Sequence, residues 1–380
     1  MDHTARLIVD SPNHDPDLFY ACHFSAGDPV IFLEHRRRKY LLLSDLELDR
    51  ARQEATVDEV LSISTVVEAK NGVRRAARRL GGRAGIVQVF CHAHRIKRLL
   101  VPETMSVGVV DALRTVGLRI DVAALPFYPQ RFFKTPGELR AMKIAQRATF
   151  AAMSLAEQML RDSIIDRNQL VWQGKPLTSE RMRAELSTFL SHQGFSCPEG
   201  MIIACGPHTI EPHNHGSGPL RPHQAIIVDI YPRSLTTRFF GDATRTFCRG
   251  TAPDALKQLY STVKTAQVAA LRQVRAGVNG QRVHGDIVKR FEAAGYATKE
   301  MNGRRQGFIH GTGHGLGYAV HEEPLRINRL PCRLRTGHVV TVEPGLYYEG
   351  IGGVRIEDVV VVTPSGADLL ARYPKRLEIL

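Results

Sequence analysis

Apolar residues recur at two different spacings in the first third of this chain. Segments 28–35 and 39–45 are short, nearly continuous apolar runs, a pattern that predicts strands. Segments 46–55, 66–81 and 109–117 carry their apolar residues at helical spacing. We therefore predict a compact α/β unit at the start of the chain.

A stretch rich in proline and aromatic residues ends this first unit. A helix start follows, because Thr135 precedes Pro136 and stands three residues before Glu138. This is the capping-box pattern with proline at the first helical position. We place the domain boundary here and expect two domains, residues 1–128 and 129–380.

The second domain repeats one order of elements twice, helices first and strands after them. In the first round we expect helices over 138–160 and 179–194 and strands over 224–231 and 237–247. In the second round we expect helices over 254–274 and 282–295 and strands over 338–348 and 353–363. This order predicts an α+β domain with a duplicated architecture and a largely antiparallel sheet.

The composition narrows the class of protein. With 380 residues, 43% hydrophobic and 23% charged, the chain falls within the globular range. No apolar run approaches the ~18 residues of a membrane span, and the N-terminus lacks the pattern of a secretory signal. The 6 cysteines form no CxxC pair, which suits reduced, buried thiols. We expect a soluble, cytoplasmic protein without a membrane partner.

The chain is basic, with 51 Lys and Arg against 38 Asp and Glu, a net charge of +13. Two clusters contribute to this excess, Arg36–Lys39 and Arg74–Arg79. Such surfaces can bind nucleic acid. Because no RNP, zinc-finger or helix-turn-helix signature accompanies the clusters, we interpret them as solvated surface and expect no nucleic-acid partner.

Four carboxylates interrupt the apolar strands of the second domain: Asp229, Asp242, Glu343 and Glu357. Burying a carboxylate costs several kcal/mol unless a positive group neutralises it. Strand periodicity places Arg355 on the same face as Glu357, but a single arginine cannot balance four acids. The set therefore needs further positive charge.

Residues 310–323, HGTGHGLGYAVHEE, place His310, His314 and His321 among alternating glycines. Glycines let the backbone approach a ligand closely, and histidines suit metal ligation and substrate hydrogen bonding. The alternative is one structural histidine and two that face solvent. The loop matches neither GxGxxG nor HExxH, and the chain has no GxSxG, so nucleotide binding and serine hydrolysis lack support.

Two divalent cations would balance the four carboxylates, with a neutral imidazole as a fifth ligand. Ligation by several oxygens and one nitrogen favours Mn²⁺, with Co²⁺ or Zn²⁺ as alternatives. Two neighbouring metals activate water and polarise a carbonyl, which is chemistry for hydrolysis.

These residues, in their order and contexts, resemble the metallopeptidases of the aminopeptidase P and prolidase group. The motifs are VDI, DATRTF, HGTGHGLG, VEPG and GVRIED, around Asp229, Asp242, His314, Glu343 and Glu357. The resemblance covers essentially the whole chain, because the first 128 residues resemble the creatinase-type N-terminal domain of those enzymes. It implies a pita-bread catalytic domain with a smaller α/β creatinase-like domain before it, and a metallo-exopeptidase.

The resemblance also assigns ligand roles. Asp229 would chelate one metal, His314 and Glu343 chiefly the other, and Asp242 and Glu357 would bridge the two. A metal-bridging hydroxide would attack the scissile carbonyl.

The same resemblance assigns roles around the metals. Glu343 would also shuttle a proton. His213 and His321 would hydrogen-bond the substrate, Arg355 would orient Glu357 or Asp229, and His310 would support the ligands from behind.

The implied substrate is an Xaa-Pro dipeptide or the N-terminus of a short peptide, and the implied assembly is a homodimer. An Xaa-Pro bond is a tertiary amide without an N–H, so it needs a pocket of its own. Dipeptidase activity is slightly favoured over aminopeptidase activity. Tyr231 and Pro232 follow Asp229–Ile230 where the family has glycine, and Asp229 and Asp242 are two residues further apart than expected. An even excess keeps both on one face of a longer hairpin, but it leaves substrate length open.

Three alternatives remain. A metal-free pita-bread binding protein could use the basic surface, but no metal ligand is missing. The creatine-hydrolysing relative of the fold lacks the full ligand set that this chain keeps. A methionine aminopeptidase-like enzyme usually lacks the N-terminal domain.

Overall fold

The computed structural model describes residues 4–68 and 82–380, and it divides the chain into two compact units, Met1–Arg131 and Phe132–Leu380. Helix α3 spans Ile63–Glu68, while the rest of the helix predicted over 66–81, with the cluster Arg74–Arg79, lies outside the described residues. Within the described ranges, no helix is both long and apolar enough to cross a membrane.

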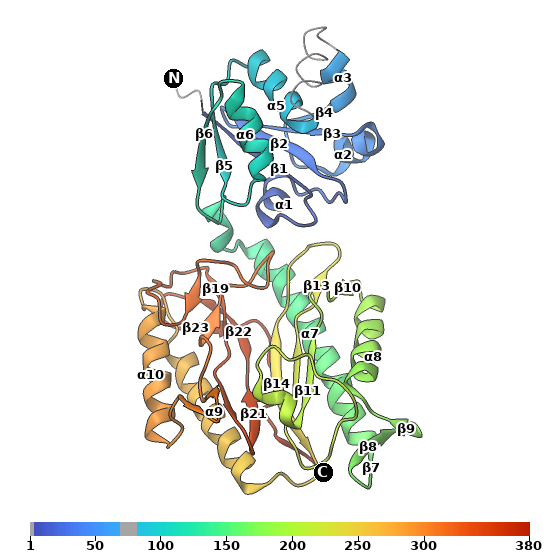
Figure 1. Cartoon of the computed structure of the whole chain (residues 1–380), viewed down its shortest axis with the longest axis vertical. Coiled ribbons are helices and arrows are strands. Elements are labelled where there is room, and N and C mark those ends of the chain that lie inside the picture. The colour runs from blue at the N-terminus through green and yellow to red at the C-terminus, as the bar shows by residue number, and fades with distance from the viewer. Residues whose placement is uncertain (1–3, 69–81) are drawn as a thin grey trace. The chain divides into compact units, whose positions relative to one another are not determined.

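A six-stranded mixed sheet forms the centre of the first unit (Figure 1). Its strands, in spatial order, are β4 (Glu59–Ser62), β3 (Arg38–Leu43), β2 (Val30–His35), β1 (Thr4–Asp10), β5 (Arg98–Pro102) and β6 (Arg119–Ala123). The other α-helices among the described residues of this unit are α1 (Pro16–Cys22), α2 (Leu48–Glu54), α5 (Gly82–Ala93) and α6 (Val107–Thr115). The strands predicted over 28–35 and 39–45 are β2 and β3, an antiparallel pair.

Asp17, on α1, fastens the end of the first unit. Its buried carboxylate accepts the N–H groups of Phe127 (3.0 Å) and Tyr128 (2.9 Å). It also forms an ion pair with the buried Arg131 at 3.0 Å. One carboxylate therefore ties the last residues of the unit to its first helix.

Four long helices flank the strands of the second unit. They are α7 (Pro136–Asp162), α8 (Ser179–His192), α9 (Asp254–Gln273) and α10 (Gly280–Ala293). Figure 1 shows α7 and α8 along one side of the strands and α9 and α10 along the other. The predicted capping box at Thr135 is present, with both of its hydrogen bonds formed. The apolar stripes of the helices pack into two core clusters, one on each side.

The strands of the second unit form several small sheets. One sheet has the order β11 (Ile202–Cys205), β12 (Ile226–Ile230), β14 (Ala243–Arg249) and β24 (Glu378–Ile379), and another has β19 (Val339–Val342), β22 (Asp358–Val362) and β23 (Ala367–Leu369). The remaining groups are β20 (Gly345–Tyr348) with β21 (Gly352–Arg355), β10 (Phe195–Ser196) with β13 (Arg233–Ser234), β15 (Lys299–Met301) with β16 (Arg304–Gln306), β17 (Gly313–His314) with β18 (Arg326–Ile327), and β7 (Ile164–Asp166), β8 (Gln169–Trp172) and β9 (Lys175–Pro176). Only β14 and β24 pair in parallel among these described strands.

Three strand predictions need correction. The strand expected over 237–247 begins only at Ala243, because the preceding residues belong to a loop. The strands expected over 338–348 and 353–363 are each interrupted. β19 pairs with β22 and β20 pairs with β21, so the chain changes partner at Glu343–Pro344 and again at Ile356–Glu357. Both carboxylates therefore lie where a strand ends and not inside one.

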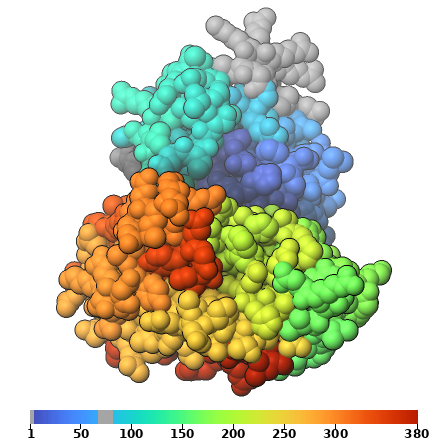
Figure 2. All heavy atoms as spheres, turned by 60° about the horizontal axis from the view of Figure 1, so that its bottom comes forward, coloured from blue at the N-terminus to red at the C-terminus, as the bar shows by residue number. Residues whose placement is uncertain are grey.

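The C-terminal segment closes the second unit. The carboxylate of Glu378 accepts the Ala252 N–H (2.9 Å) and pairs with Lys257 at 3.4 Å. In Figure 2 this segment (red) reaches the surface next to the yellow segment at the start of α9. The last residues of the chain are thus joined to the start of the second round of helices.

Candidate metal centre

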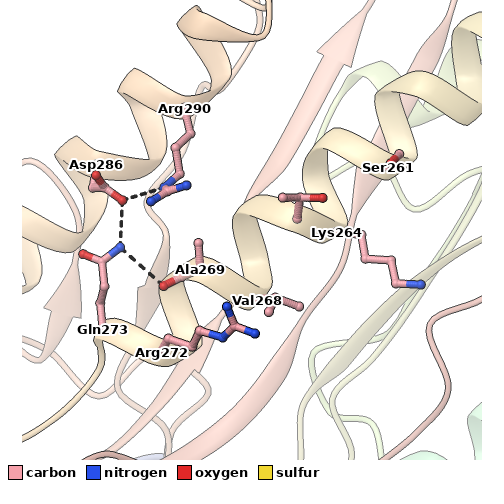
Figure 3. Close-up of a pocket in the computed structure, with 9 residues that line it drawn as sticks. Ser261, Lys264, Val268, Ala269, Arg272, Gln273, Asp286 and Arg290 are labelled. Carbon is pink, nitrogen blue, oxygen red and sulfur yellow. Dashed lines mark hydrogen bonds and ion pairs between the residues drawn. The ribbon is translucent and has the colours of Figure 1, made fainter.

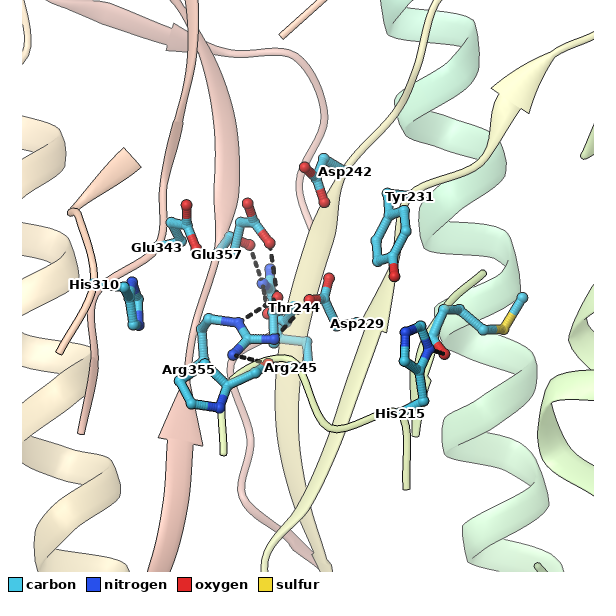
Figure 4. Close-up of polar contacts among 12 residues, drawn as sticks. His215, Asp229, Tyr231, Asp242, Thr244, Arg245, His310, Glu343, Arg355 and Glu357 are labelled. Atoms are coloured by element: carbon cyan, nitrogen blue, oxygen red, sulfur yellow. Dashed lines mark hydrogen bonds and ion pairs between the residues drawn. The ribbon is translucent and has the colours of Figure 1, made fainter. Parts of the chain in front are cut away.

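All five residues expected to ligate metal line one cavity of about 440 Å³. They are Asp229 on β12, Asp242 before β14, His314 on β17, Glu343 after β19 and Glu357 before β22. Figure 4 shows the carboxylates of the four acids directed toward one space. Three regions of the second unit that are far apart in sequence therefore contribute to a single site.

Strand register places the two aspartates on the same side. Asp229 pairs with Thr244, so Asp242, two residues before Thr244, points in the same direction as Thr244. Helix α7 fixes Asp242 through Gln146, whose amide donates to the Asp242 carbonyl (2.7 Å) and accepts the Asp242 N–H (3.0 Å). Gly241 permits this approach, because a Cβ there would lie 2.7 Å from the Ala145 carbonyl oxygen.

His314 faces two of the carboxylates. Its Nε2 lies 3.4 Å from Glu343 Oε1 and 3.8 Å from Asp242 Oδ2. Its Nδ1 lies 3.1 Å from the carbonyl oxygen of Gly315. A carbonyl only accepts hydrogen bonds, so Nδ1 carries the proton, and burial, which lowers the pKa of His314, keeps the ring neutral. The Nε2 lone pair then faces carboxylate oxygens, an arrangement that a cation would stabilise.

The acids themselves indicate a shortage of positive charge. Burial, and then repulsion by neighbouring acids, raises the pKa of Asp242 and of Glu357 well above the usual value. Burial raises the pKa of Glu343 to about 7. The Oδ1 atom of Asp229 is buried and has no hydrogen-bond partner. Ligand atoms of Asp242, His314 and Glu357 all lie within 4.8 Å of one another, so the donor set fits divalent cations.

Arg355 satisfies the other oxygen of Asp229. Its Nη2 lies 2.6 Å from Asp229 Oδ2, its Nη1 donates to the Tyr347 hydroxyl (2.9 Å), and its Nε donates to Thr244 Oγ1 (3.2 Å). Thr244 Oγ1 in turn donates to Glu357 Oε2 at 2.7 Å. Of the two acids that Arg355 was expected to orient, it contacts Asp229 directly and reaches Glu357 only through Thr244.

The three remaining histidines differ in what they can offer. His213 and His321 are exposed and line the cavity, and the His321 ring lies 4.3 Å from the His314 ring. His310 has both ring nitrogens engaged, Nδ1 with the Gly311 carbonyl (2.7 Å) and Nε2 with the Tyr347 hydroxyl (2.8 Å). Burial lowers the pKa of His310 to about 3, so the ring is neutral. His310 is thus linked to Arg355 through the Tyr347 hydroxyl.

Sequence reasoning missed several residues that shape this site. Tyr347 joins Arg355 to His310, and Thr244 joins Arg355 to Glu357. Tyr347 and Thr244 could have been found from the alternation of strand side chains. Thr244 lies two residues after the expected site residue Asp242, and Tyr347 lies two residues from the strand partner of Arg355. Glu199, His215, Tyr231, Glu323 and Arg326 also line the cavity. Of these five, the sequence drew attention only to Tyr231, as a departure from the family pattern, and to the segment that contains Glu323.

A larger hollow of about 750 Å³ lies between α9 and α10 (Figure 3). Three of its polar groups pair with one another: Arg290 Nε lies 2.7 Å from Asp286 Oδ2, and Gln273 donates to the same oxygen at 2.7 Å. It has a single carboxylate and no histidine among its lining residues. The metal-binding chemistry of the described residues is therefore concentrated in the smaller cavity.

The sequence model of metallopeptidase family M24 matches residues 140–364, which are 225 of the 380 residues. This chain belongs to metallopeptidase family M24. The matched segment contains all five residues of the M24 chain that were expected to ligate metal.

Two of the relatives of this M24 chain are named as dipeptidases. It is 32% identical over 204 residues to "Probable dipeptidase PepE" of Mycobacterium tuberculosis, covering 53% of this chain and 52% of the relative. It is 28% identical over 254 residues to "Xaa-Pro dipeptidase" of Lactobacillus delbrueckii subsp. lactis, covering 66% of this chain and 62% of the relative. The matches thus span about half to three fifths of the length of these curated relatives.

Solved structures share the fold of this M24 chain. X-Pro aminopeptidase from Thermotoga maritima has a TM-score of 0.80 at 23% identity and covers 99% of this chain and 97% of its own. Prolidase from Pyrococcus horikoshii has a TM-score of 0.78 at 22% identity, with coverages of 98% and 95%. These matches confirm the predicted fold class, a pita-bread domain preceded by a smaller α/β unit.

Proposed function

We propose that this chain is a dinuclear metal-dependent exopeptidase that hydrolyses Xaa-Pro bonds, and that it is a dipeptidase rather than an aminopeptidase. The convergence of Asp229, Asp242, His314, Glu343 and Glu357 on one cavity carries the proposal. The names of the relatives, Xaa-Pro dipeptidase and probable dipeptidase, support the choice of substrate.

In this proposal two divalent ions, Mn²⁺ in the first place with Co²⁺ or Zn²⁺ as alternatives, are held by the five residues. Asp229 would hold one ion, His314 and Glu343 chiefly the other, and Asp242 and Glu357 would contribute to both. When bound, such ions lower the pKa of water and polarise a carbonyl oxygen. The neutral Nε2 of His314 and the unpartnered Oδ1 of Asp229 are free to act as ligands.

The chain's own residues would then bind the substrate and move the proton. Glu343 would take a proton from the attacking water and pass it to the proline nitrogen. His213 and His321 would hydrogen-bond the peptide, because both are exposed on the cavity wall. Arg355 would hold Asp229, and His310 would hold Arg355 in place through Tyr347. The expected homodimer stays a prediction.

A second candidate function, cleavage of longer peptides, has one observation in its favour. Another hollow, of about 680 Å³, shares Pro212, His213 and His310 with the site cavity. It offers room for residues beyond proline. Substrate length must therefore be measured directly.

The deciding experiment compares Ala–Pro, Ala–Pro–Ala and Ala–Ala as substrates of chelated protein to which Mn²⁺ has been restored. Turnover of Ala–Pro alone is expected and indicates a dipeptidase. Turnover of the tripeptide would assign aminopeptidase activity instead, and a preference for Ala–Ala would contradict proline specificity. Chelation without added metal should abolish all turnover.

A further inference from the structure

Arg245, on β14, is a charged side chain with no exposure to solvent. Its neighbours in the strand, Thr244 and Thr246, hydrogen-bond groups of the site segment, namely Glu357 Oε2 (2.7 Å) and the Arg355 carbonyl (2.9 Å). Because strand side chains alternate, Arg245 leaves β14 on the other face, where the rings of Phe150 and Tyr373 lie 5.4 and 5.7 Å from its guanidinium. A buried guanidinium persists only when its donors are satisfied.

Every N–H group of Arg245 has an acceptor. The acceptors are the carbonyl oxygens of Thr244 (2.9 Å), Glu357 (2.5 Å), Tyr373 (3.1 Å) and Pro374 (3.1 Å) and the carboxylate of Asp358 (2.7 Å). These five bonds use all five donors of a guanidinium. Arg245 therefore joins three segments at one point: β14, the Glu357–Asp358 segment and the C-terminal segment.

Asp358 completes this arrangement. Its second oxygen lies 2.6 Å from Lys375 Nζ and accepts the Gln267 amide at 3.0 Å. Lys375 also donates to the Gln267 side-chain oxygen (2.7 Å). We call Arg245, Asp358, Gln267 and Lys375 the Arg245 clamp.

The Arg245 clamp contacts Glu357, whose backbone belongs to neither of the two neighbouring strand ladders. Glu357 stands between β21 and β22, at the point where the chain changes strand partner. Its N–H donates to the Thr244 carbonyl (3.1 Å), and its carbonyl accepts from Arg245, so both backbone groups are held from β14 (Figure 4). The direction of the Glu357 carboxylate thus depends on Thr244 and Arg245.

We propose that Arg245 is a positioning residue, which sets the place of Glu357 so that its carboxylate can bind divalent ions. The inference rests on the proposed function, because only there is Glu357 a metal ligand. Lysine is a poor substitute at this position, since one ammonium group has three donors and no planar fork. Arg245→Lys keeps the charge but should release the Glu357 carbonyl.

The same strand supplies a matched control. Arg249, at the end of β14, donates to the carbonyls of Ser163 (3.0 Å) and Ile379 (3.1 Å), so it also ties the C-terminal segment to the fold. No hydrogen bond of the described residues joins it to Glu357 or Asp358. Arg249→Lys therefore repeats the chemical change and loosens the same terminal segment, but it leaves the metal ligand untouched.

The test titrates Mn²⁺ into chelated wild-type protein, Arg245→Lys and Arg249→Lys by calorimetry, after circular dichroism has shown that each is folded. We expect Arg245→Lys to bind Mn²⁺ about 10–100-fold more weakly than the wild type, as for other groups that orient metal ligands. Arg249→Lys should stay within about threefold. At saturating Co²⁺, the ligand-field spectrum should change in Arg245→Lys alone. Equal affinity of Arg245→Lys and wild type, or equal weakening in both variants, would overturn the proposal.

Asp358→Asn keeps the test decisive if Arg245→Lys does not fold. It removes the charge at the other end of the clamp and leaves the guanidinium in place, so it should weaken Mn²⁺ binding in the same direction. Wild-type affinity for Mn²⁺ in a folded Asp358→Asn variant would also contradict the proposed role of the Arg245 clamp. A wild-type protein that binds no Mn²⁺ would instead contradict the proposed function itself.

Discussion

His314 shows what the structure adds to a residue that the sequence names as a candidate metal ligand. Its sequence context indicates a ligand, but only the structure defines its tautomer. Because Gly315 offers a carbonyl to Nδ1, the free lone pair is on Nε2 and points toward Glu343 and Asp242. Protonation of Nε2 would give it a hydrogen to share with these carboxylates, but burial opposes protonation, because it lowers the pKa of His314. A cation relieves this arrangement without that cost.

The first prediction concerns Asp242→Asn. The change preserves shape and both backbone bonds to Gln146, but it removes a buried charge that a metal would need. Ligand present at 100 times its Kd stabilises a protein by about 2.7 kcal/mol. Excess Mn²⁺ should therefore raise the thermal midpoint of the wild type and leave that of Asp242→Asn unchanged.

His321→Gln is the control for that experiment. His321 lines the same cavity but is proposed to contact substrate, so this variant should keep the Mn²⁺-induced shift while losing turnover. A Mn²⁺ shift that survives in Asp242→Asn, or one that disappears in His321→Gln, would contradict the assigned roles.

The second prediction concerns the pH dependence of folding in the first unit. Asp15 caps α1 by accepting the Leu18 N–H (2.8 Å), and burial raises its pKa from 3.8 to about 6. The folded state therefore holds this proton more tightly than the unfolded state, so Asp15 costs stability as pH rises through this window, and the full cost applies above it.

An asparagine side chain at this position would keep the cap and never ionise, so Asp15→Asn should stabilise the protein by about 1–3 kcal/mol at pH 8. The gain should shrink steadily as the pH falls toward 4, which urea unfolding at several pH values can measure. A gain of equal size at all pH values would show that desolvation of the carboxylate is not its cause.

At the scale of elements, the sequence predicts helices better than strand ends. Helix α7 follows from its apolar stripe and its capping box, which are both local features. The strand expected over 237–247 is wrong in its first half because Phe239 and Phe240 are buried in a loop, where Phe239 stacks on Tyr318 at 4.2 Å. Burial of aromatic side chains produces the same pattern in a loop as in a strand.

The breaks at Glu343 and Glu357 could not be predicted, because each depends on which strand pairs with which. β19 and β22 form one ladder, and β20 and β21 form another. In each case the sequence shows apolar residues on both sides of the carboxylate, a pattern that one strand with a buried acid would also give. Strand partners come from contacts far apart in sequence, and those contacts leave no local signal.

The third prediction concerns an ion pair that holds the loop carrying His321. Lys134 Nζ lies 2.6 Å from Glu322 Oε2, both side chains are 1% exposed, and Glu322 also accepts the Tyr318 N–H (2.9 Å). Removing one partner of a buried ion pair takes this compensation from the other charge, which costs about 3–5 kcal/mol. We expect Lys134→Met to lose this amount of stability in urea unfolding.

A paired variant separates charge from packing. Adding Glu322→Gln to Lys134→Met removes the charge that has lost Lys134 and retains an oxygen for the Tyr318 N–H, so part of the lost stability should return. If the double variant is less stable than Lys134→Met alone, the cost arises from packing and not from an uncompensated charge.

For the molecule as a whole, the sequence predicted the fold class better than the contacts between distant segments. The five expected ligands came from a family resemblance and from acids in apolar runs, and all of them line one cavity, although their role as ligands stays a prediction. The Arg36–Lys39 cluster proves to be the tip of the β2–β3 hairpin, with Arg36 and Arg37 at φ of 52° and 65°. By contrast, Lys134 and Glu322 are 188 residues apart, and nothing in the sequence pairs the lysine with the segment 310–323 that contains Glu322.

The last prediction uses the separate cores of the two units. In the described residues, two hydrophobic clusters draw only on the first unit, and the two largest clusters draw only on the second. The single tryptophan, Trp172, packs against a cluster of the second unit, which also holds every proposed metal ligand. Trp172 fluorescence therefore reports on the unit that contains the proposed metal ligands, and excess Mn²⁺ should shift its urea midpoint upward.

Asp17→Ala provides the contrast from the first unit. Asp17 holds Arg131 and the N–H groups of Phe127 and Tyr128, so its loss should cost the first unit about 3–5 kcal/mol. We expect circular dichroism to show an earlier unfolding step in this variant, while the Trp172 transition and its Mn²⁺ shift stay as in the wild type. Because a chain that unfolds cooperatively would show one coincident transition by both probes, a joint shift in Asp17→Ala would contradict independent unfolding of the two cores.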